Sequence, residues 1–201
     1  ESPDAILREF KDTLDITYHR FSKNMGGISL VKQWERCIEL INGEEWITIL
    51  GDDDVYAANV VEKFYDNLEE INSENIKVVR FATLVIDDSD KIIGKLCQHP
   101  TKEKATDFLI RKFKGGTRST LSEYIFKTET VKRIKFKEFP LAWSSDVLAV
   151  VEFSKNKNIY SINDATVQFR ISDFNITGKA DSVKKNMAWF KFHVYLLSNH
   201  G

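Results

Sequence analysis

The segment Trp-Ile-Thr-Ile-Leu-Gly-Asp-Asp-Asp, residues 46–54, says most about how this chain folds. Its first five residues form an almost continuous apolar run of strand length. Such runs are typical of strands that are covered on both faces, as in the parallel sheets of α/β proteins. Gly51 and three consecutive aspartates follow at once. We therefore expect residues 46–50 to form a central, mostly buried strand, with the acidic turn 52–54 at its exposed carboxyl end.

Helical and strand patterns alternate on both sides of this segment, as in an α/β protein. Before it, apolar residues recur at spacings of three and four on one helical face: Val31, Trp34, Ile38 and Ile41. After it, a second helical pattern covers residues 60–71, and residues 78–86 are another long strand candidate. The remaining patterns predict helices at 4–11, 104–113, 145–155 and 180–198, and strands at 14–18, 121–126, 159–162 and 166–171.

The composition fits one globular domain, or one domain with a small appendage. Of the 201 residues, 42% are hydrophobic and 29% are charged, and 29 basic residues nearly balance 30 acidic ones. This balance argues against a protein whose main task is to bind nucleic acid phosphates. No apolar stretch reaches the ~18 residues of a membrane span, and the polar start does not resemble a signal peptide. The two cysteines form no framework, Cys37 is predicted to be buried, and a cytoplasmic protein is expected.

The three adjacent aspartates predict a metal site. Carboxylates that are packed together repel one another and lose solvation, unless a cation neutralises them. Carboxylate oxygens suit Mg²⁺ or Mn²⁺, which commonly bridge one or two carboxylates to substrate phosphates. In open α/β sheets, ligands also bind at the carboxyl ends of strands. The alternative is a solvated turn at the start of the next helix, where carboxylates are favoured as well.

Several short motifs follow one another in an order that resembles family 2 glycosyltransferases, whose domains have the GT-A fold. In chain order they are Ser2-Pro3-Asp4, the turn Asn24-Met25-Gly26-Gly27, the helix with Trp34, the acidic turn 52–54, Gly115-Gly116-Thr117-Arg118, Ala142-Trp143-Ser144-Ser145-Asp146, and Val167-Gln168-Phe169-Arg170 followed by Asn175-Ile176-Thr177. The resemblance implies an α/β, GT-A-like mixed sheet flanked by helices, in a single domain over residues 1–201. Its donor and metal half would cover about 1–90, its acceptor half about 91–178, and a C-terminal helix 179–201.

The resemblance also implies an incomplete domain. The family's domain begins with two strands whose ends hold the nucleotide base, and nothing in this sequence corresponds to them. We therefore expect an N-terminally truncated GT-A domain, which is a fragment or is completed by a partner. A homodimer or strand-swapped assembly would complete it, since the strand predicted at 14–18 would otherwise leave an exposed edge.

The resemblance assigns roles to individual residues. Asp146 would be the general base that deprotonates the acceptor hydroxyl, in a direct displacement that inverts the sugar carbon; in the alternative, it only occupies the first turn of a helix. Mn²⁺ or Mg²⁺ on Asp53 and Asp54 would neutralise the diphosphate, although the spaced pair Asp52 and Asp54 also fits the motif. For Arg170, the alternative is a surface ion pair. The other assignments are donor binding by Asn24, Gly26, Asp52 and Arg170, and acceptor binding by Gly115, Gly116 and Trp143.

The predicted function is transfer of a sugar from a nucleotide-diphosphate donor, with a UDP-sugar expected. The acceptor would be a saccharide or a lipid-linked saccharide in bacterial polysaccharide biosynthesis, and no nucleic acid partner is expected. Two other functions stay open: a Mg²⁺-dependent nucleotidyltransferase, and a non-catalytic, degenerate GT-A module that binds a sugar or a partner. The nucleotidyltransferase would usually show a Gly-rich phosphate loop with Arg or Lys near its start, and this sequence has none.

The predicted C-terminal helix carries an apolar stripe whose members repeat at spacings of four and three: Val183, Met187, Phe190, Val194 and Leu197. We expect this stripe to pack on the body of the protein, the ordinary position of such a face. The alternative is a helix that lies on a membrane surface, supported by nearby lysines: Lys179, Lys184, Lys185 and Lys191. That alternative would place the protein at the inner face of the membrane.

Overall fold

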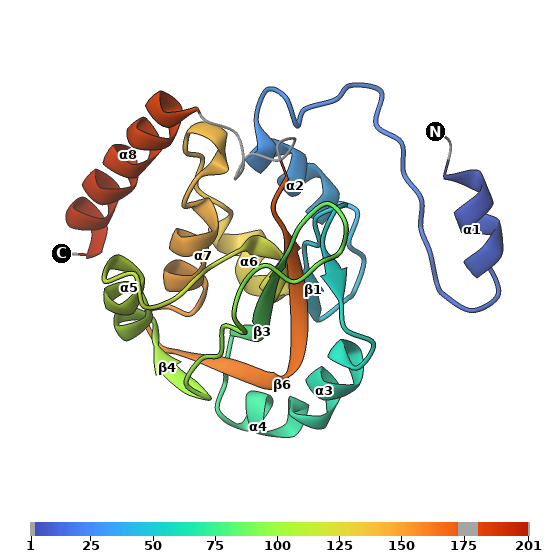
Figure 1. The fold of residues 1–201 in the computed structure, drawn as a ribbon, viewed down its shortest axis with the longest axis horizontal. Helices are drawn as coiled ribbons and strands as arrows, with labels where there is room; N and C mark the ends of the chain where they lie inside the picture. Colours follow the sequence, from blue (N-terminus) through green and yellow to red (C-terminus); the bar gives the residue numbers. More distant parts are fainter. Residues whose placement is uncertain (1–2, 173–180, 201) are drawn as a thin grey trace.

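The computed structural model describes residues 3–172 and 181–200 of the chain. Within them, one mixed six-stranded sheet is covered by helices (Figure 1). The strands are β1 Trp46–Thr48, β2 Val55–Tyr56, β3 Val78–Ile86, β4 Lys102–Lys104, β5 Tyr124–Lys127 and β6 Asn158–Arg170. Their order is β1-β5-β3-β6-β2, with β4 paired to β6. Only β3 and β6 are parallel among these pairs. The predicted mixed sheet flanked by helices is therefore confirmed.

Both faces of the sheet are buried under helices. The described helices are α1 Asp4–Phe10, α2 Leu30–Ile38, α3 Val60–Asp66, α4 Leu68–Ser73, α5 Ala105–Phe113, α6 Thr128–Ile134, α7 Ser145–Phe153 and α8 Ser182–His200, with short 3-10 turns η1 Leu121–Glu123 and η2 Pro140–Ala142. One core contains residues of α2, α5, α6, α7 and α8, and the other contains residues of α3 and α4. Val78 and Val79 belong to different cores, because successive side chains of a strand point to opposite faces.

β3 lies at the centre of the sheet, between β5 and β6. The prediction of a strand at 78–86 is confirmed over its full length, and eight of its nine residues are buried. The prediction of a central, buried strand at 46–50 is wrong. β1 ends at Thr48 and lies at the sheet edge, and Leu50 is 45% exposed. Among the described residues, no strand pairs with the second side of β1, so its apolar run is covered only in part.

The N-terminal region departs further from expectation. The predicted helix at 4–11 is present as α1, but residues 14–18 form no strand. In Figure 1, α1 and the segment after it extend away from the sheet, so these residues have no neighbouring strand with which to pair. The prediction of a buried Cys37 is also wrong, because α2 turns Val31 and Ile38 into the core and leaves the thiol exposed.

The other predicted elements are present with changes of extent, whereas β2, β4 and α6 were not predicted. The strand expected at 121–126 begins at Tyr124, after the 3-10 turn η1. The helices expected at 104–113, 145–155 and 180–198 correspond to α5, α7 and α8. Two strands expected at the end of the chain are one continuous strand, β6. Asn67 divides the helix expected at 60–71 into α3 and α4. Its amide donates to the carbonyl of Lys63 at 2.8 Å and accepts from the hydroxyl of Tyr160 at 2.9 Å, which stabilises the break.

The orientation of α8 contradicts the expectation for its stripe. The helix packs on the body through a different set of residues, of which Ala188 and Phe192 are fully buried and Leu196 nearly so. Phe192 contacts the rings of Phe113 and Phe139. All five residues of the predicted stripe are exposed instead. The helix has two apolar faces, and a spacing pattern does not decide which of them meets the body. Of the described helices, none is both long and apolar enough to cross a membrane.

Candidate functional site

The acidic turn 52–54 connects β1 to β2, and Asp54 is its best-held member. The hydroxyl of Ser122 donates to one carboxylate oxygen at 2.5 Å, and the backbone N–H of Arg170 donates to the other at 3.0 Å. Burial raises the pKa of Asp54 above its ordinary value, and these two hydrogen bonds offset part of that rise. Asp52 is exposed and Asp53 is half-buried. The turn therefore combines the fixed carboxylate of Asp54 with the exposed carboxylate of Asp52.

The carboxylates of Asp53 and Asp54 converge over Gly51. A β-carbon at Gly51 would lie 3.1 Å from an oxygen of Asp54 and 3.2 Å from an oxygen of Asp53. A side chain there would fill the space that the two oxygens share. This paired, all-oxygen donor set fits Mg²⁺ or Mn²⁺, which are held by one or two carboxylates with phosphates and water completing the shell. Among residues 3–172 and 181–200, no group of three or more His, Cys, Asp or Glu could hold a metal by itself.

Arg170 fastens the acidic turn to a second acidic loop after β3. Its Nε donates to the backbone carbonyl of Asp53 at 2.9 Å, and its two terminal nitrogens donate to the carbonyl of Asp87 at 2.6 Å and the carboxylate of Asp90 at 2.5 Å. The bond with Asp90 raises the pKa of Arg170. The ion pair matches the simpler alternative for this arginine, and its contacts position Asp53 and Asp54. A contact with donor phosphates stays a prediction.

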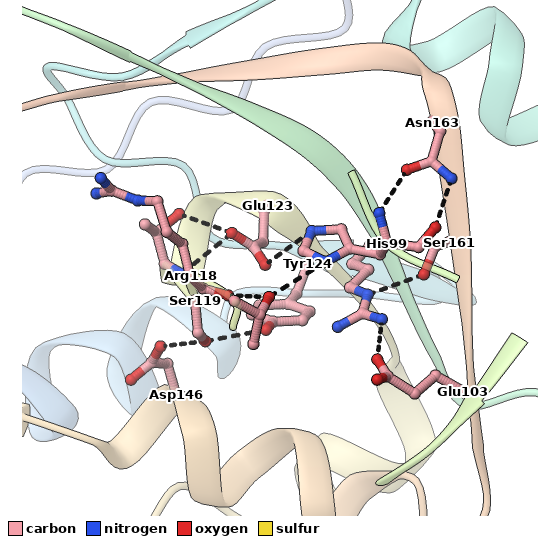
Figure 2. Close-up of polar contacts among 12 residues, drawn as sticks. His99, Glu103, Arg118, Ser119, Glu123, Tyr124, Asp146, Ser161 and Asn163 are labelled. Atoms are coloured by element: carbon pink, nitrogen blue, oxygen red, sulfur yellow. Dashed lines mark hydrogen bonds and ion pairs between the residues drawn. The ribbon is translucent and has the colours of Figure 1, made fainter. Parts of the chain in front are cut away.

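Asp146, the predicted base, lies in the first turn of α7 and is half-buried. Its carboxylate accepts a hydrogen bond from the hydroxyl of Ser119 at 2.8 Å, and Ser119 is 2.9 Å from the hydroxyl of Tyr124. Figure 2 shows Ser119 between the two. Burial raises the pKa of Asp146, while the bond from Ser119 works in the opposite direction. A raised pKa makes a carboxylate a stronger base, and Ser119 fixes its direction.

The backbone before α7 is strained. Leu141, Ala142 and Ser144 have φ values of 60°, 53° and 70°, in the left-handed region that residues with a β-carbon rarely adopt. Each such residue costs on the order of 1–3 kcal/mol and persists only where its surroundings enforce it. The three together set the direction in which α7 begins. Asp146 follows within two residues, so this backbone determines where its carboxylate lies.

A four-residue segment joins the acidic turn to Asp146. Ser122 contacts Asp54 and donates its hydroxyl there, while its oxygen also accepts from the N–H of Gly51 at 3.0 Å. Ser119, three residues earlier, contacts Asp146. Three residues of extended chain span at most about 11 Å. The structure therefore brings Asp54 and Asp146 into contact with the two ends of one short segment, although β1 and α7 are far apart in sequence.

Arg118 precedes this segment and was not among the residues singled out for binding. Its guanidinium carbon lies 5.6 Å from the centre of the Phe169 ring, next to Arg170. In the described part of the chain, no carboxylate forms an ion pair with it. Figure 2 shows its guanidinium turned away from His99 and Glu103. A cation without a carboxylate, close to both ends of the segment 119–122, is suited to an anionic group of a substrate.

A buried network of charged side chains lies next to the segment 119–122. Arg80, which is fully buried, donates to Ser161 at 2.8 Å and pairs with Glu103. Glu103 also accepts two hydrogen bonds from Arg111, both at 2.8 Å. Arg111 in turn donates to the carbonyl of Gly116 at 3.2 Å. The network thereby holds the loop that leads to Arg118.

His99 and Glu123 continue this network toward the site. Burial, together with the charges of Arg80 and Arg111, lowers the pKa of His99 to about 3, so the imidazole is neutral at ordinary pH. Burial raises the pKa of Glu123 to about 7. The carboxylate of Glu123 accepts from the backbone N–H of Thr120 at 3.1 Å. Glu123 therefore stabilises the conformation of the segment 119–122 from its buried side.

The predicted acceptor-side residues have clear structural roles. Gly115 has a φ of 71°, and the N–H groups of Gly115 and Gly116 donate to the carbonyls of Lys112 and Arg111. This pair of bonds is the Schellman motif that ends α5, and its left-handed position favours glycine. Trp143 is half-buried and lies under the ammonium of Lys185, 4.7 Å away. Contact of these residues with an acceptor stays a prediction.

Asn24 and Gly26 form a local turn before α2. The side-chain oxygen of Asn24 accepts from the backbone N–H of Gly26 at 2.9 Å, and both residues are exposed. Their role in donor binding stays a prediction. The motif at 175–177 lies outside the described residues. Ser119 and Ser122, which connect the site, had no signal in the sequence, because single serines in a polar loop follow no spacing rule.

Comparisons with known proteins agree with the fold. No protein-family model matches the chain, and no curated protein sequence matches it. Solved structures do match: S. aureus TarS 1–349 in complex with UDP-GlcNAc has a TM-score of 0.63 at 14% identity over 90% of this chain. S. aureus TarS 1–349 alone has a TM-score of 0.57 at 14% identity over 83% of it. The chain spans about half of those chains, 49% and 47%. The GT-A-like α/β fold expected for this chain is the fold that it shares with TarS.

Proposed function

We propose that this chain is the catalytic part of an inverting, metal-dependent glycosyltransferase that uses a UDP-sugar as donor. The observation that supports the proposal is the segment 119–122, in which Ser119 contacts the carboxylate of Asp146 and Ser122 contacts that of Asp54, beside Asp53. The likeness of the fold to a TarS structure that contains UDP-GlcNAc supports a nucleotide sugar as the ligand. A saccharide or lipid-linked acceptor in polysaccharide synthesis agrees with the family resemblance.

The reaction uses the residues in distinct ways. Asp146 accepts the proton of the acceptor hydroxyl, whose oxygen forms the new bond to the sugar carbon, while the bond to the diphosphate breaks and its electron pair leaves with the diphosphate. Ser119 keeps the carboxylate of Asp146 directed at that hydroxyl. Arg118 contacts the diphosphate oxygens. Mg²⁺ or Mn²⁺ on Asp53 and Asp54 would supply charge neutralisation of the leaving group.

A calorimetric titration tests donor binding. UDP-GlcNAc and UDP are titrated into the chain with Mn²⁺, with Mg²⁺ or with excess chelator. Binding is expected only with the metal, and the double change of Asp53→Asn and Asp54→Asn should abolish it. Asp88→Asn is the matched control, because Asp88 lies in the neighbouring acidic loop. This substitution removes one negative charge nearby and leaves the carboxylates of Asp53 and Asp54 in place. Unchanged binding in chelator would refute the metal assignment.

Turnover separates the base from a helix-capping residue. Asp146→Asn should leave UDP-sugar affinity nearly unchanged and reduce UDP release by on the order of 10²-fold or more. Asp107→Asn is the control, since Asp107 occupies the first turn of α5 as Asp146 does that of α7. Pyrophosphate release would indicate a nucleotidyltransferase. Binding of UDP-sugar without any turnover, across saccharide and lipid-linked acceptors, would indicate a non-catalytic module and refute the proposal.

A further inference from the structure

The outward face of α8 is an apolar stripe that no described residue covers. We call it the outer stripe; its members are 46% to 77% exposed and are Val183, Met187, Phe190, Val194 and Leu197. Over a helix this row is about 21 Å long. It lies opposite the face of Ala188 and Phe192, which packs on the body. In Figure 1, α8 forms an outer margin of the molecule. Such a row is more apolar surface than the exposure of single residues explains.

The apolar surface continues from α8 onto the end of α5. Phe113 is 46% exposed and contacts the rings of Trp189 and His193 on α8. Ile110, one turn earlier on α5, is also exposed. Two helices that are separate in sequence therefore contribute to one margin of the molecule (Figure 1). A surface built in this way is a property of the fold and not an accident of a single helix.

Apart from its histidines, the acidic and basic side chains within α8 itself are all lysines. The sequence of α8 contains three lysines and no aspartate or glutamate. Lys184 and Lys191 each follow a member of the outer stripe directly and are exposed. Asp181, just before the helix, is paired with Lys184 at 3.1 Å. Lys114 adds an exposed cation beside Phe113. An occupant of this surface therefore has to be apolar in its middle and anionic at its rim.

These charges disfavour a second copy of the chain as the occupant. The outer stripe has the four-three spacing of a coiled-coil seam, in which residues at the flanks pair with opposite charges of the partner helix. Here one flank offers Lys184 and Lys191, and the other offers Asn186 and His193. Two such helices would bring lysines together, or would place lysines beside Asn186 and His193. No pairing of the two flanks produces an ion pair.

We propose that the outer stripe of α8 docks on the surface of an anionic phospholipid membrane, with the helix parallel to the membrane plane. Apolar side chains with a rim of lysines are the pattern of helices that lie in the membrane interface. The apolar members enter the boundary between headgroups and acyl chains, and the lysines contact lipid phosphates. The helix does not cross the membrane, in agreement with its moderate length and hydropathy. The proposal rests on this surface alone and is independent of the proposed enzyme activity.

Vesicle flotation tests this proposal. The chain is mixed with vesicles of phosphatidylcholine alone or of phosphatidylcholine with phosphatidylglycerol. Binding is expected only with the anionic lipid, and it should weaken as salt rises, because salt screens the lysines. The double change of Lys184→Gln and Lys191→Gln should weaken binding about 10- to 30-fold, since each lysine near an anionic surface contributes roughly fivefold. Equal binding to both kinds of vesicle would overturn the anionic membrane.

Two pairs of substitutions distinguish binding through the outer stripe from nonspecific binding of exposed apolar residues. Phe190→Ser with Leu197→Ser should reduce binding at least tenfold, because both side chains would leave the interface. Val61→Ser with Tyr65→Ser removes similarly exposed apolar groups from α3 and should leave binding unchanged. Circular dichroism melting confirms that all variants fold. The proposal is overturned if the wild-type chain does not bind anionic vesicles. It is also overturned if sedimentation shows a dimer that the double substitution Phe190→Ser and Leu197→Ser dissociates.

Discussion

Glu103→Gln should destabilise the protein by about 3–5 kcal/mol, because the change removes the negative charge between two guanidinium groups. Arg80 is completely buried, and Glu103 is its ion-pair partner. Arg111 binds the same carboxylate with two nitrogens at 2.8 Å. Glutamine keeps the shape of the side chain, so the loss comes from leaving a buried positive charge without its counter-ion. The predicted loss of stability is the cost of leaving the charge of Arg80 uncompensated, and it exceeds the net contribution of the ion pair to the stability of the wild type.

Urea denaturation measures this effect at neutral pH and at decreasing pH. Burial alone would raise the pKa of Glu103, but the hydrogen bonds from Arg111 and Arg80 outweigh it, and its pKa is lowered. A carboxylate with a lowered pKa contributes stability that is present above the unfolded value near 4.5 and is lost as pH falls through the folded value. The variant should lack that loss. Glu129→Gln is the matched control, since Glu129 pairs with Lys77 on the surface, where solvent screens the pair, and this variant should be destabilised far less than Glu103→Gln.

A loss of less than about 1 kcal/mol in Glu103→Gln would refute the buried-charge explanation. A second variant distinguishes charge burial from poor packing. Glu103→Leu combined with Arg80→Met replaces the pair by apolar groups and should be much less destabilised than either single change. If the double variant is as unstable as Glu103→Gln, the site depends on hydrogen bonds of Ser161 and Arg111 more than on the charge of the pair.

Three further predictions concern the core and the site. Burial raises the pKa of Glu123 to about 7, so its neutral form contributes stability that is complete below about pH 4.5 and is lost as pH rises through about 7. The free energy of unfolding of the wild type should therefore fall by on the order of 3 kcal/mol between about pH 5 and about pH 8. Glu123→Gln should remove this fall, as measured by urea denaturation. Ser122→Ala removes one of the two donors to Asp54 and leaves the N–H of Gly51 without its acceptor, and should cost about 2–4 kcal/mol in the same assay. Phe192→Ala should cost about 3–5 kcal/mol and lower the melting temperature of the whole domain.

Matched controls make these three predictions decisive. Glu62→Gln removes a carboxylate from the surface of α3 and is the control, and an equal change in both variants would contradict the role of Glu123. Ser73→Ala removes an exposed, local hydrogen bond and should cost under about 0.5 kcal/mol. Phe190→Ala, two residues from Phe192 but exposed, should be nearly neutral. Comparable losses at Phe190 and Phe192 would mean that α8 packs through its other face.

The sequence predicted local elements well and the order of strands poorly. The strand at 78–86 and the helix of α5 depend on runs of residues whose own propensity and spacing suffice. The centre of a sheet depends on which strands pair across long stretches of chain. β3 becomes central because β6, some eighty residues later, pairs with it in parallel. The apolar run at 46–50 was predicted to be the central strand, yet it lacks a second neighbour among the described residues.

The candidate site divides in the same way. The acidic turn was visible because three aspartates after an apolar run are unusual. Its contact with Arg170 depends on the pairing of β2 with β6, which places Gln168 opposite Val55. Ser119 and Ser122 could not have been found, since a serine acquires its importance only when the fold brings a carboxylate within hydrogen-bond distance. Arg118 belongs to a motif that the sequence indicated, but only the folded structure shows that no carboxylate of the described residues pairs with it.

The burial and strain around segment 119–122 argue against a merely solvated acidic turn. A network of buried charges is often less stable than apolar residues of the same volume, and the left-handed residues before Asp146 carry a further cost. Both features fix the same few side chains. A module that only had to fold would gain stability by replacing Arg80 and Glu103 and by placing glycine at Ser144. The fold instead holds Asp146 and Asp54 in set directions at the two ends of one segment, as the proposed displacement between an acceptor and a diphosphate would require.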